Sequence, residues 1–97
     1  MATNKMRPIH PGEIIREEYL LPLQMTPHAL AMALRVPAPR INDIVRERRA
    51  VSPDTALRLA RYFNTTPRFW LNLQAAHDLS RAEKKNDYST IRKRPAA

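Results

Sequence analysis

The chain contains no cysteine, a single glycine and no long apolar run, and each shortage removes a class of function. Without cysteine there is no disulfide framework, no thiolate-ligated zinc or iron–sulfur centre and no thiol nucleophile. One glycine cannot build a glycine-rich phosphate loop. No segment approaches the roughly 18–20 consecutive apolar residues of a membrane span, and the first seven residues lack the apolar core of a signal peptide. At 97 residues, we expect one small domain in a reducing compartment.

Positive charge is abundant and unevenly placed along the chain. Seventeen Lys and Arg residues outnumber nine Asp and Glu residues, which gives a formal net charge of +8. Residues 1–34 are neutral overall, whereas residues 35–68 contain eight arginines and three acidic residues. Arginine presents a planar fork of donors that suits phosphate groups and guanine edges. The excess therefore favours nucleic acid as the partner, against the alternative that these charges only solvate a helix surface.

Hydroxyl–proline pairs mark three helix starts, at Thr26-Pro27, Ser52-Pro53 and Thr66-Pro67. The hydroxyl can cap the helix, and a proline at the first helical position loses no hydrogen bond. Apolar spacing adds two further helices. The predicted helices span residues 11–21 (ended by Pro22), 27–34, 39–46, 53–63 and 67 to at least 79, with room to continue to 85. No alternating strand pattern is present, so we predict an all-α, five-helix domain over residues 8–79 and a basic, partly disordered tail over residues 80–97.

Residues 26–51 fit a helix-turn-helix, because two short helices are separated by a turn of about three to four residues. Ala31 is small enough for the second helix to pack across the first, and Val36 can fill the angle between them. Ile41 and Ile44 then anchor the second helix to the core. Its opposite face is left free to enter the major groove of DNA.

Side chains on that free face predict how DNA would be read. Arginine pairs with guanine and asparagine with adenine, so Arg40 and Asn42 are the principal candidates for base contacts. The full set assigned to base edges is Pro39, Arg40, Asn42 and Asp43. Groups at the start of the preceding helix and arginines at the end of the second helix are assigned to phosphates. They are Thr26, His28, Arg46, Arg48 and Arg49.

The last predicted helix is apolar on more than one face. Phe69 and Leu73 share one stripe, while Trp70 and Leu71 point away from it. A second buried surface is most simply supplied by a two-fold dimer, which assigns Phe69, Trp70, Leu71 and Leu73 to a dimer interface. The alternative is that Trp70 packs beneath the first helix in the core of the monomer.

The polar residues do not assemble into a catalytic or metal site. The three histidines lack the spacing of metal ligands, and Glu17 and Glu18 point about 100° apart on one helix. Ser52 and Thr66 are used as caps, which leaves no nucleophile beside a base. We therefore expect no enzymatic activity, no metal and no cofactor.

Four segments resemble the HigA/VapI group of antitoxins, which are small members of the Xre or lambda-repressor-like helix-turn-helix class. They are Pro11-Gly12-Glu13 before an apolar helix, INDIVR at residues 41–46, TALRLARYF at 55–63 and FWLNLQ at 69–74. The resemblance covers about residues 8–79. It implies a five-helix, lambda-repressor-like domain and a homodimer that binds double-stranded operator DNA at its own promoter. It also implies a type II toxin–antitoxin module, in which the protein neutralises a RelE-like or HigB-like toxin that cleaves messenger RNA. Such a repressor would be cytoplasmic and associated with the bacterial nucleoid.

The chain departs from the group at positions where its members usually have glycine. Arg35 and Glu47 would be forced into left-handed backbone, or would shift the turn, at a cost of roughly 1 kcal/mol, whereas Asn64 tolerates that backbone. Ala38-Pro39 also lacks the polar groups common at the start of the recognition helix. An alternative function is therefore a toxin-binding module with only electrostatic affinity for DNA. A basic RNA-associated protein is disfavoured, because the aromatic residues have core spacing.

Overall fold

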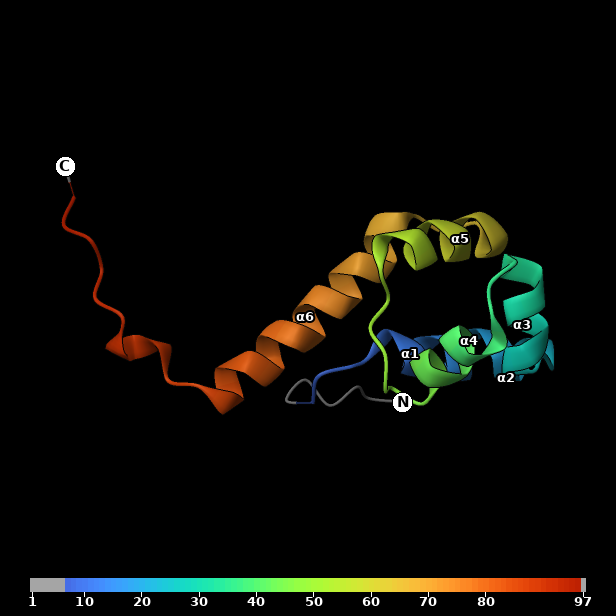
Figure 1. Cartoon of the computed structure of the whole chain (residues 1–97), viewed down its shortest axis with the longest axis horizontal. Coiled ribbons are helices and arrows are strands. Elements are labelled where there is room, and N and C mark those ends of the chain that lie inside the picture. Colours follow the sequence, from blue (N-terminus) through green and yellow to red (C-terminus); the bar gives the residue numbers. More distant parts are fainter. Residues whose placement is uncertain (1–6, 97) are drawn as a thin grey trace.

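The computed structural model describes residues 7–96 and shows helices α1 to α5 gathered into one group, with the long helix α6 extending from it (Figure 1). The described residues contain helices and no strands, which confirms the all-α prediction. The elements are α1 (Pro11–Ile14), the π-helix η1 (Ile15–Leu20), α2 (Leu21–Leu23), α3 (Pro27–Leu34), α4 (Ala38–Val45), α5 (Pro53–Phe63), α6 (Pro67–Lys85) and the 3-10 helix η2 (Tyr88–Thr90). None of these helices is long and apolar enough to cross a membrane. The expectation about a signal peptide rests almost entirely on residues 1–6, which lie outside the described residues.

The three predicted hydroxyl caps are all present. Thr26, Ser52 and Thr66 each accept a hydrogen bond from a backbone N–H in the first turn of α3, α5 and α6 respectively. α3 and α5 have the predicted bounds, and α4 begins one residue before the predicted start. α6 continues through Leu79 to Lys85, so its last six residues lie in the segment that the sequence assigned to the tail.

The first helical segment does not end at Pro22, and that prediction was wrong. α1, η1 and α2 follow one another without a break, and the segment ends at Gln24, whose φ of 54° is left-handed. In a regular α-helix the proline ring would collide with the carbonyl four residues back. A π turn precedes Pro22, in which the N–H of Leu21 donates to the carbonyl of Arg16, five residues earlier. This wider turn relieves the conflict and lets the helix pass through the proline.

Trp70 is the largest fully buried side chain, and its assignment to a dimer interface was wrong. Its ring centroid lies 5.6 Å from that of Tyr19 on η1 and 6.4 Å from that of Phe63 on α5. The indole Nε1 donates to the hydroxyl of Thr65 at 2.8 Å, so the one polar group of the ring is satisfied inside the core. The alternative prediction, that Trp70 packs in the core of the monomer, is confirmed. Leu71 and Leu73 are partly buried against that core, and Phe69 is 39% exposed.

The single glycine lies where α1 meets α4. A Cβ atom at Gly12 would sit 1.8 Å from the backbone carbonyl oxygen of Ile44, far inside contact distance. The obstacle is backbone, so a rotamer change cannot remove it. Gly12 therefore sets how closely α4 approaches the first helix.

We predict that Gly12→Ala lowers the free energy of unfolding by about 1–3 kcal/mol, because α1 and α4 must move apart. Urea unfolding followed by circular dichroism measures the change. Arg61→Ala, an exposed substitution on α5, should stay within about 0.5 kcal/mol of the wild type. Equal stability of Gly12→Ala and the wild type would contradict this contact.

His10 caps α1 from a buried position. Its Nδ1 accepts a hydrogen bond from the backbone N–H of Gly12 at 2.9 Å. Its ring meets that of His77 on α6 edge-on, with the centroids 4.9 Å apart. Burial, and secondarily the neighbouring His77, lower the pKa of His10 below its ordinary value. Protonation at Nδ1 would remove the acceptor and leave a charge inside the fold.

This lowered pKa predicts that acid weakens the fold. The unfolded chain takes up a proton at an ordinary histidine pKa of about 6.5, while the folded chain resists it to lower pH. The stabilisation is therefore complete above the unfolded pKa and is lost as pH falls through the folded pKa. His10→Asn keeps a neutral capping acceptor and should flatten the decline of Tm between about pH 7.5 and pH 5. His28→Asn, at an exposed histidine, should keep the wild-type slope. An unchanged slope in His10→Asn would contradict the assignment.

Candidate nucleic-acid interface

α3 and α4 form the helix-turn-helix that the sequence predicts. α3 ends at Leu34 and is capped by Arg35, after which the N–H of Val36 returns to the carbonyl of Ala31 at 3.0 Å. Ala31, Val36, Ile41 and Ile44 are all buried in the core. The side chains expected to join the two helices therefore lie where they were predicted, and the opposite face of α4 is left toward solvent.

Left-handed backbone occurs at the positions where the sequence lacks the usual glycines. The φ angles are 60° at Arg35, 63° at Glu47 and 57° at Asn64. The chain thus accepts the strained conformation at Arg35 and Glu47 instead of shifting the turns. Gln24, at the end of α2, is a further residue of this kind that the sequence did not reveal.

The predicted base-contacting residues lie on the solvent side of α4. Pro39 is exposed, whereas Arg40, Asn42 and Asp43 are half-buried. Two of them are already paired within the chain. The Nη1 of Arg40 donates to Oδ2 of Asp54 at 2.8 Å, and the Oδ2 of Asp43 lies 3.4 Å from Nη2 of Arg49.

The residues assigned to phosphates fall at the two ends of the helix-turn-helix. The hydroxyl oxygen of Thr26 accepts a hydrogen bond from the N–H of Ala29 at 3.0 Å. A phosphate at this end of α3 would therefore be bound by backbone groups or by exposed neighbouring side chains. His28 is exposed at the start of α3. Arg46, Arg48 and Arg49 are exposed directly after α4. Their contacts with DNA stay predictions.

Arg16 is a structural residue of this interface that the sequence did not reveal. It donates to the carbonyl of Val45, the last residue of α4, and its Nη2 lies 3.4 Å from the carboxylate of Glu47. A cation at this position complements the negative end of the helix dipole. No sequence signal links Arg16 to residues that lie about thirty positions further along the chain.

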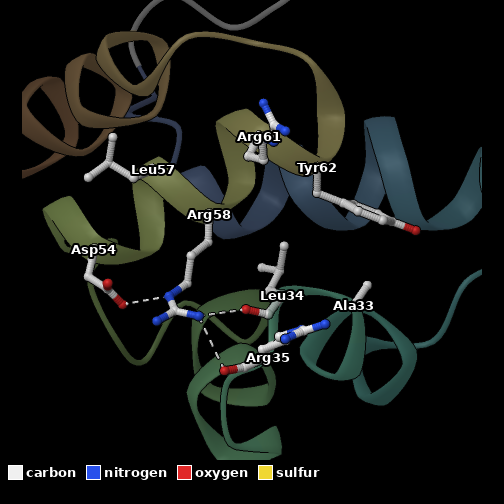
Figure 2. A pocket seen from close by; sticks show the side chains of 8 residues that line it. All are labelled: Ala33, Leu34, Arg35, Asp54, Leu57, Arg58, Arg61 and Tyr62. Atoms are coloured by element: carbon white, nitrogen blue, oxygen red, sulfur yellow. Dashed lines mark hydrogen bonds and ion pairs between the residues drawn. The ribbon is translucent and has the colours of Figure 1, made fainter.

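Asp54 and Arg58 on α5 are two further residues that sequence reasoning missed. Figure 2 shows Arg58 between Asp54 and the end of α3, where its Nη1 donates to the carbonyls of Leu34 at 2.8 Å and Arg35 at 3.3 Å. Its Nε donates to Asp54 at 2.9 Å. The hydrogen bonds from Arg58 and Arg40 lower the pKa of Asp54, which keeps this carboxylate ionised. These residues border an open groove of about 350 Å³ between α3 and α5.

The described residues contain no group of three or more His, Cys, Asp or Glu side chains placed to hold a metal ion. What remains is a short helix with one side toward solvent, followed by exposed arginines and joined to a second helix by a tight turn. This arrangement defines a helix-turn-helix domain of the DNA-binding class.

Comparison with known proteins agrees with that class. A family model for helix-turn-helix domains, HTH_3, matches residues 15–70. Virulence-associated protein I of Dichelobacter nodosus is 58% identical over 81 residues, which make up 84% of this chain and 75% of that protein.

Two solved structures are also similar. One is the Pseudomonas aeruginosa antitoxin HigA with the higBA promoter, at 52% identity and a TM-score of 0.83, covering 87% of this chain and 91% of that chain. The other is the antitoxin GraA in complex with its operator, at 48% identity and a TM-score of 0.86 over the whole of both chains. The protein therefore belongs to the helix-turn-helix family and, within it, to the HigA group of antitoxins, which confirms the resemblance seen in the sequence. The family is one of DNA-binding regulators.

Proposed function

We propose that the protein is a sequence-specific transcriptional repressor that acts as the antitoxin of a type II module. It represses its own operon and neutralises a RelE-like or HigB-like toxin that cleaves messenger RNA. The observation that carries the proposal is the exposed face of α4, on which Arg40 and Asn42 lie among flanking arginines. The promoter-bound HigA and operator-bound GraA structures support it, because both share this fold at about half sequence identity.

In this proposal α4 enters the major groove and the flanking groups fix its register. Arg40 donates to a guanine edge and Asn42 pairs with adenine, with Pro39 and Asp43 beside them. Arg46, Arg48 and Arg49 bind phosphates after α4, and the first turn of α3 at Thr26 and His28 binds phosphate on the other side. The net charge of +8 adds a salt-dependent attraction to any duplex. The protein acts in the bacterial cytoplasm, at the nucleoid.

The protein binds as a homodimer, and α6 supplies the contact. Because Trp70 faces the monomer core, the dimer surface must lie on the other side of that helix. Phe69, Ala76 and Leu79 are exposed there, and Leu79 is 64% exposed although it is a large apolar side chain. A dimeric helix-turn-helix repressor binds two half-sites about one helical turn, ~34 Å, apart, and we expect the same spacing here.

The test of sequence-specific binding is Arg40→Ala, measured by fluorescence anisotropy with the protein's own upstream promoter and with a scrambled duplex at about 150 mM salt. The wild type should prefer the promoter. Arg40→Ala should lose about 1–3 kcal/mol of promoter affinity and leave scrambled binding almost unchanged. Arg61→Ala, an exposed arginine on α5, is the matched control and should weaken both duplexes alike.

Equal losses on both duplexes in Arg40→Ala would remove the base-reading role. A wild type that binds both duplexes equally, and releases both as salt rises, would instead support the alternative function. The protein would then be a toxin-binding module with a basic surface.

The dimer surface predicts that Leu79→Glu yields monomers, because it places a charge in an apolar contact. Light scattering coupled to gel filtration reports the mass of the particle. Leu57→Glu introduces the same charge at an apolar residue on α5 that is 60% exposed, and should leave the dimer intact. A dimeric Leu79→Glu would show that α6 does not supply the contact.

A further inference from the structure

One carboxylate joins the candidate base-reading arginine to the framework of the domain. The Oδ2 of Asp54 accepts from Nη1 of Arg40 at 2.8 Å and from Nε of Arg58 at 2.9 Å. We call these three residues the Arg40–Asp54–Arg58 network. It connects the first turn of α4, which faces solvent, to the first turn of α5.

Arg58 fixes the position of this carboxylate. Its Nη1 is held by the carbonyls of Leu34 and Arg35, which end α3, so its guanidinium cannot follow Asp54 if the carboxylate moves (Figure 2). Asp54 lies at the second position of α5, directly after the Ser52 cap and Pro53, where the backbone is regular. Both sides of the carboxylate are therefore anchored, and Arg40 binds to an acceptor of fixed position.

The contact leaves Arg40 able to bind a base. A guanidinium carries five N–H donors, and a guanine edge requires two of them. Asp54 occupies one donor on Nη1. A long side chain that is already held in one rotamer loses less conformational freedom when it binds, so an arginine with a fixed orientation discriminates better between bases.

We infer that Asp54 is a positioning residue for base recognition, and that it acts by orienting Arg40 toward the major groove. The inference rests on the proposed function, because it requires Arg40 to contact a base. Asp54 would not itself bind DNA. Its side chain is 57% exposed and negatively charged, so it repels the phosphates of any duplex.

These two effects of Asp54 have opposite signs, which gives the inference a distinctive signature. Removing the charge should strengthen binding to a scrambled duplex, because a repulsion is lost. The same change should weaken the preference for the promoter, because Arg40 is no longer oriented. A residue that only stabilises the start of α5 would change the unfolding temperature and leave the preference as it was.

The experiment compares Asp54→Asn with the wild type on the promoter and scrambled duplexes. Asparagine has the same shape and no charge, and we expect the ratio of the two affinities to fall about five- to tenfold while scrambled binding tightens. Glu83→Gln, an exposed residue near the end of α6, makes the same change in net charge and should leave the ratio unchanged. Thermal unfolding of each variant establishes that it is folded at the temperature of measurement.

Two further variants keep the result decisive. Asp54→Glu retains the charge but displaces the carboxylate by one methylene, so it should also lower the ratio of promoter to scrambled affinity. It replaces Asp54→Asn as the test if Asp54→Asn does not fold. In an Arg40→Ala background, Asp54→Asn should produce no further fall in the ratio, because the residue to be positioned is gone.

An unchanged ratio in both Asp54 variants, in a protein whose wild type prefers its promoter, would overturn the inference and leave the proposed function standing. A rise in the ratio would also overturn it, since Asp54 would then compete with DNA for Arg40. If Asp54→Asn lowered the ratio by the same factor in the Arg40→Ala background as in the wild type, the inference would also be overturned. A wild type without preference would remove the proposed function and the inference together.

Discussion

The geometry of the helix-turn-helix depends on how the carbonyl groups at the end of α3 are satisfied. The last carbonyls of a helix have no partners within it. Here Arg35 turns into left-handed backbone, Val36 returns its N–H to Ala31, and Arg58 donates from α5 to the carbonyls of Leu34 and Arg35. These contacts fix the direction in which the chain enters α4. Because Arg58 also holds Asp54, the same residue connects the turn to the arginine that we assign to base recognition.

The other end of α4 is held by the first helical segment. The carbonyl of Ile44 lies against Gly12, and Arg16 donates to the carbonyl of Val45. α4 is only eight residues long, and an isolated helix of that length is not stable in water. Its conformation therefore comes from contacts at both ends and from its buried apolar side. A recognition helix fixed in this way can present side chains with the accuracy that base discrimination requires.

Much of this fold could be predicted from sequence because the signals are local. A hydroxyl followed by proline defines a helix start within two residues, and the burial of Ile41 and Ile44 follows from helical spacing. The failures have non-local causes. Pro22 was read as a helix end because the preceding π turn has no sequence signature. The apolar faces of the last helix predict a dimer interface at Trp70, and this fails because the side chains that cover Trp70, Tyr19 and Phe63, come from other helices and leave no local signal. The candidate DNA-contacting residues could be predicted from their residue types and their positions on the helix. The contact between Arg40 and Asp54 could not, because it joins residues fourteen positions apart on two different helices.

We infer that α4 reads DNA through an Arg40 side chain held by Asp54. A crystal structure of the protein bound to a duplex from its own promoter tests this most directly. We expect the Arg40 guanidinium to donate to the O6 and N7 atoms of a guanine in the major groove while Asp54 still accepts from its Nη1. An Arg40 side chain that lies on a phosphate, or that has left Asp54 to reach the base, would contradict it.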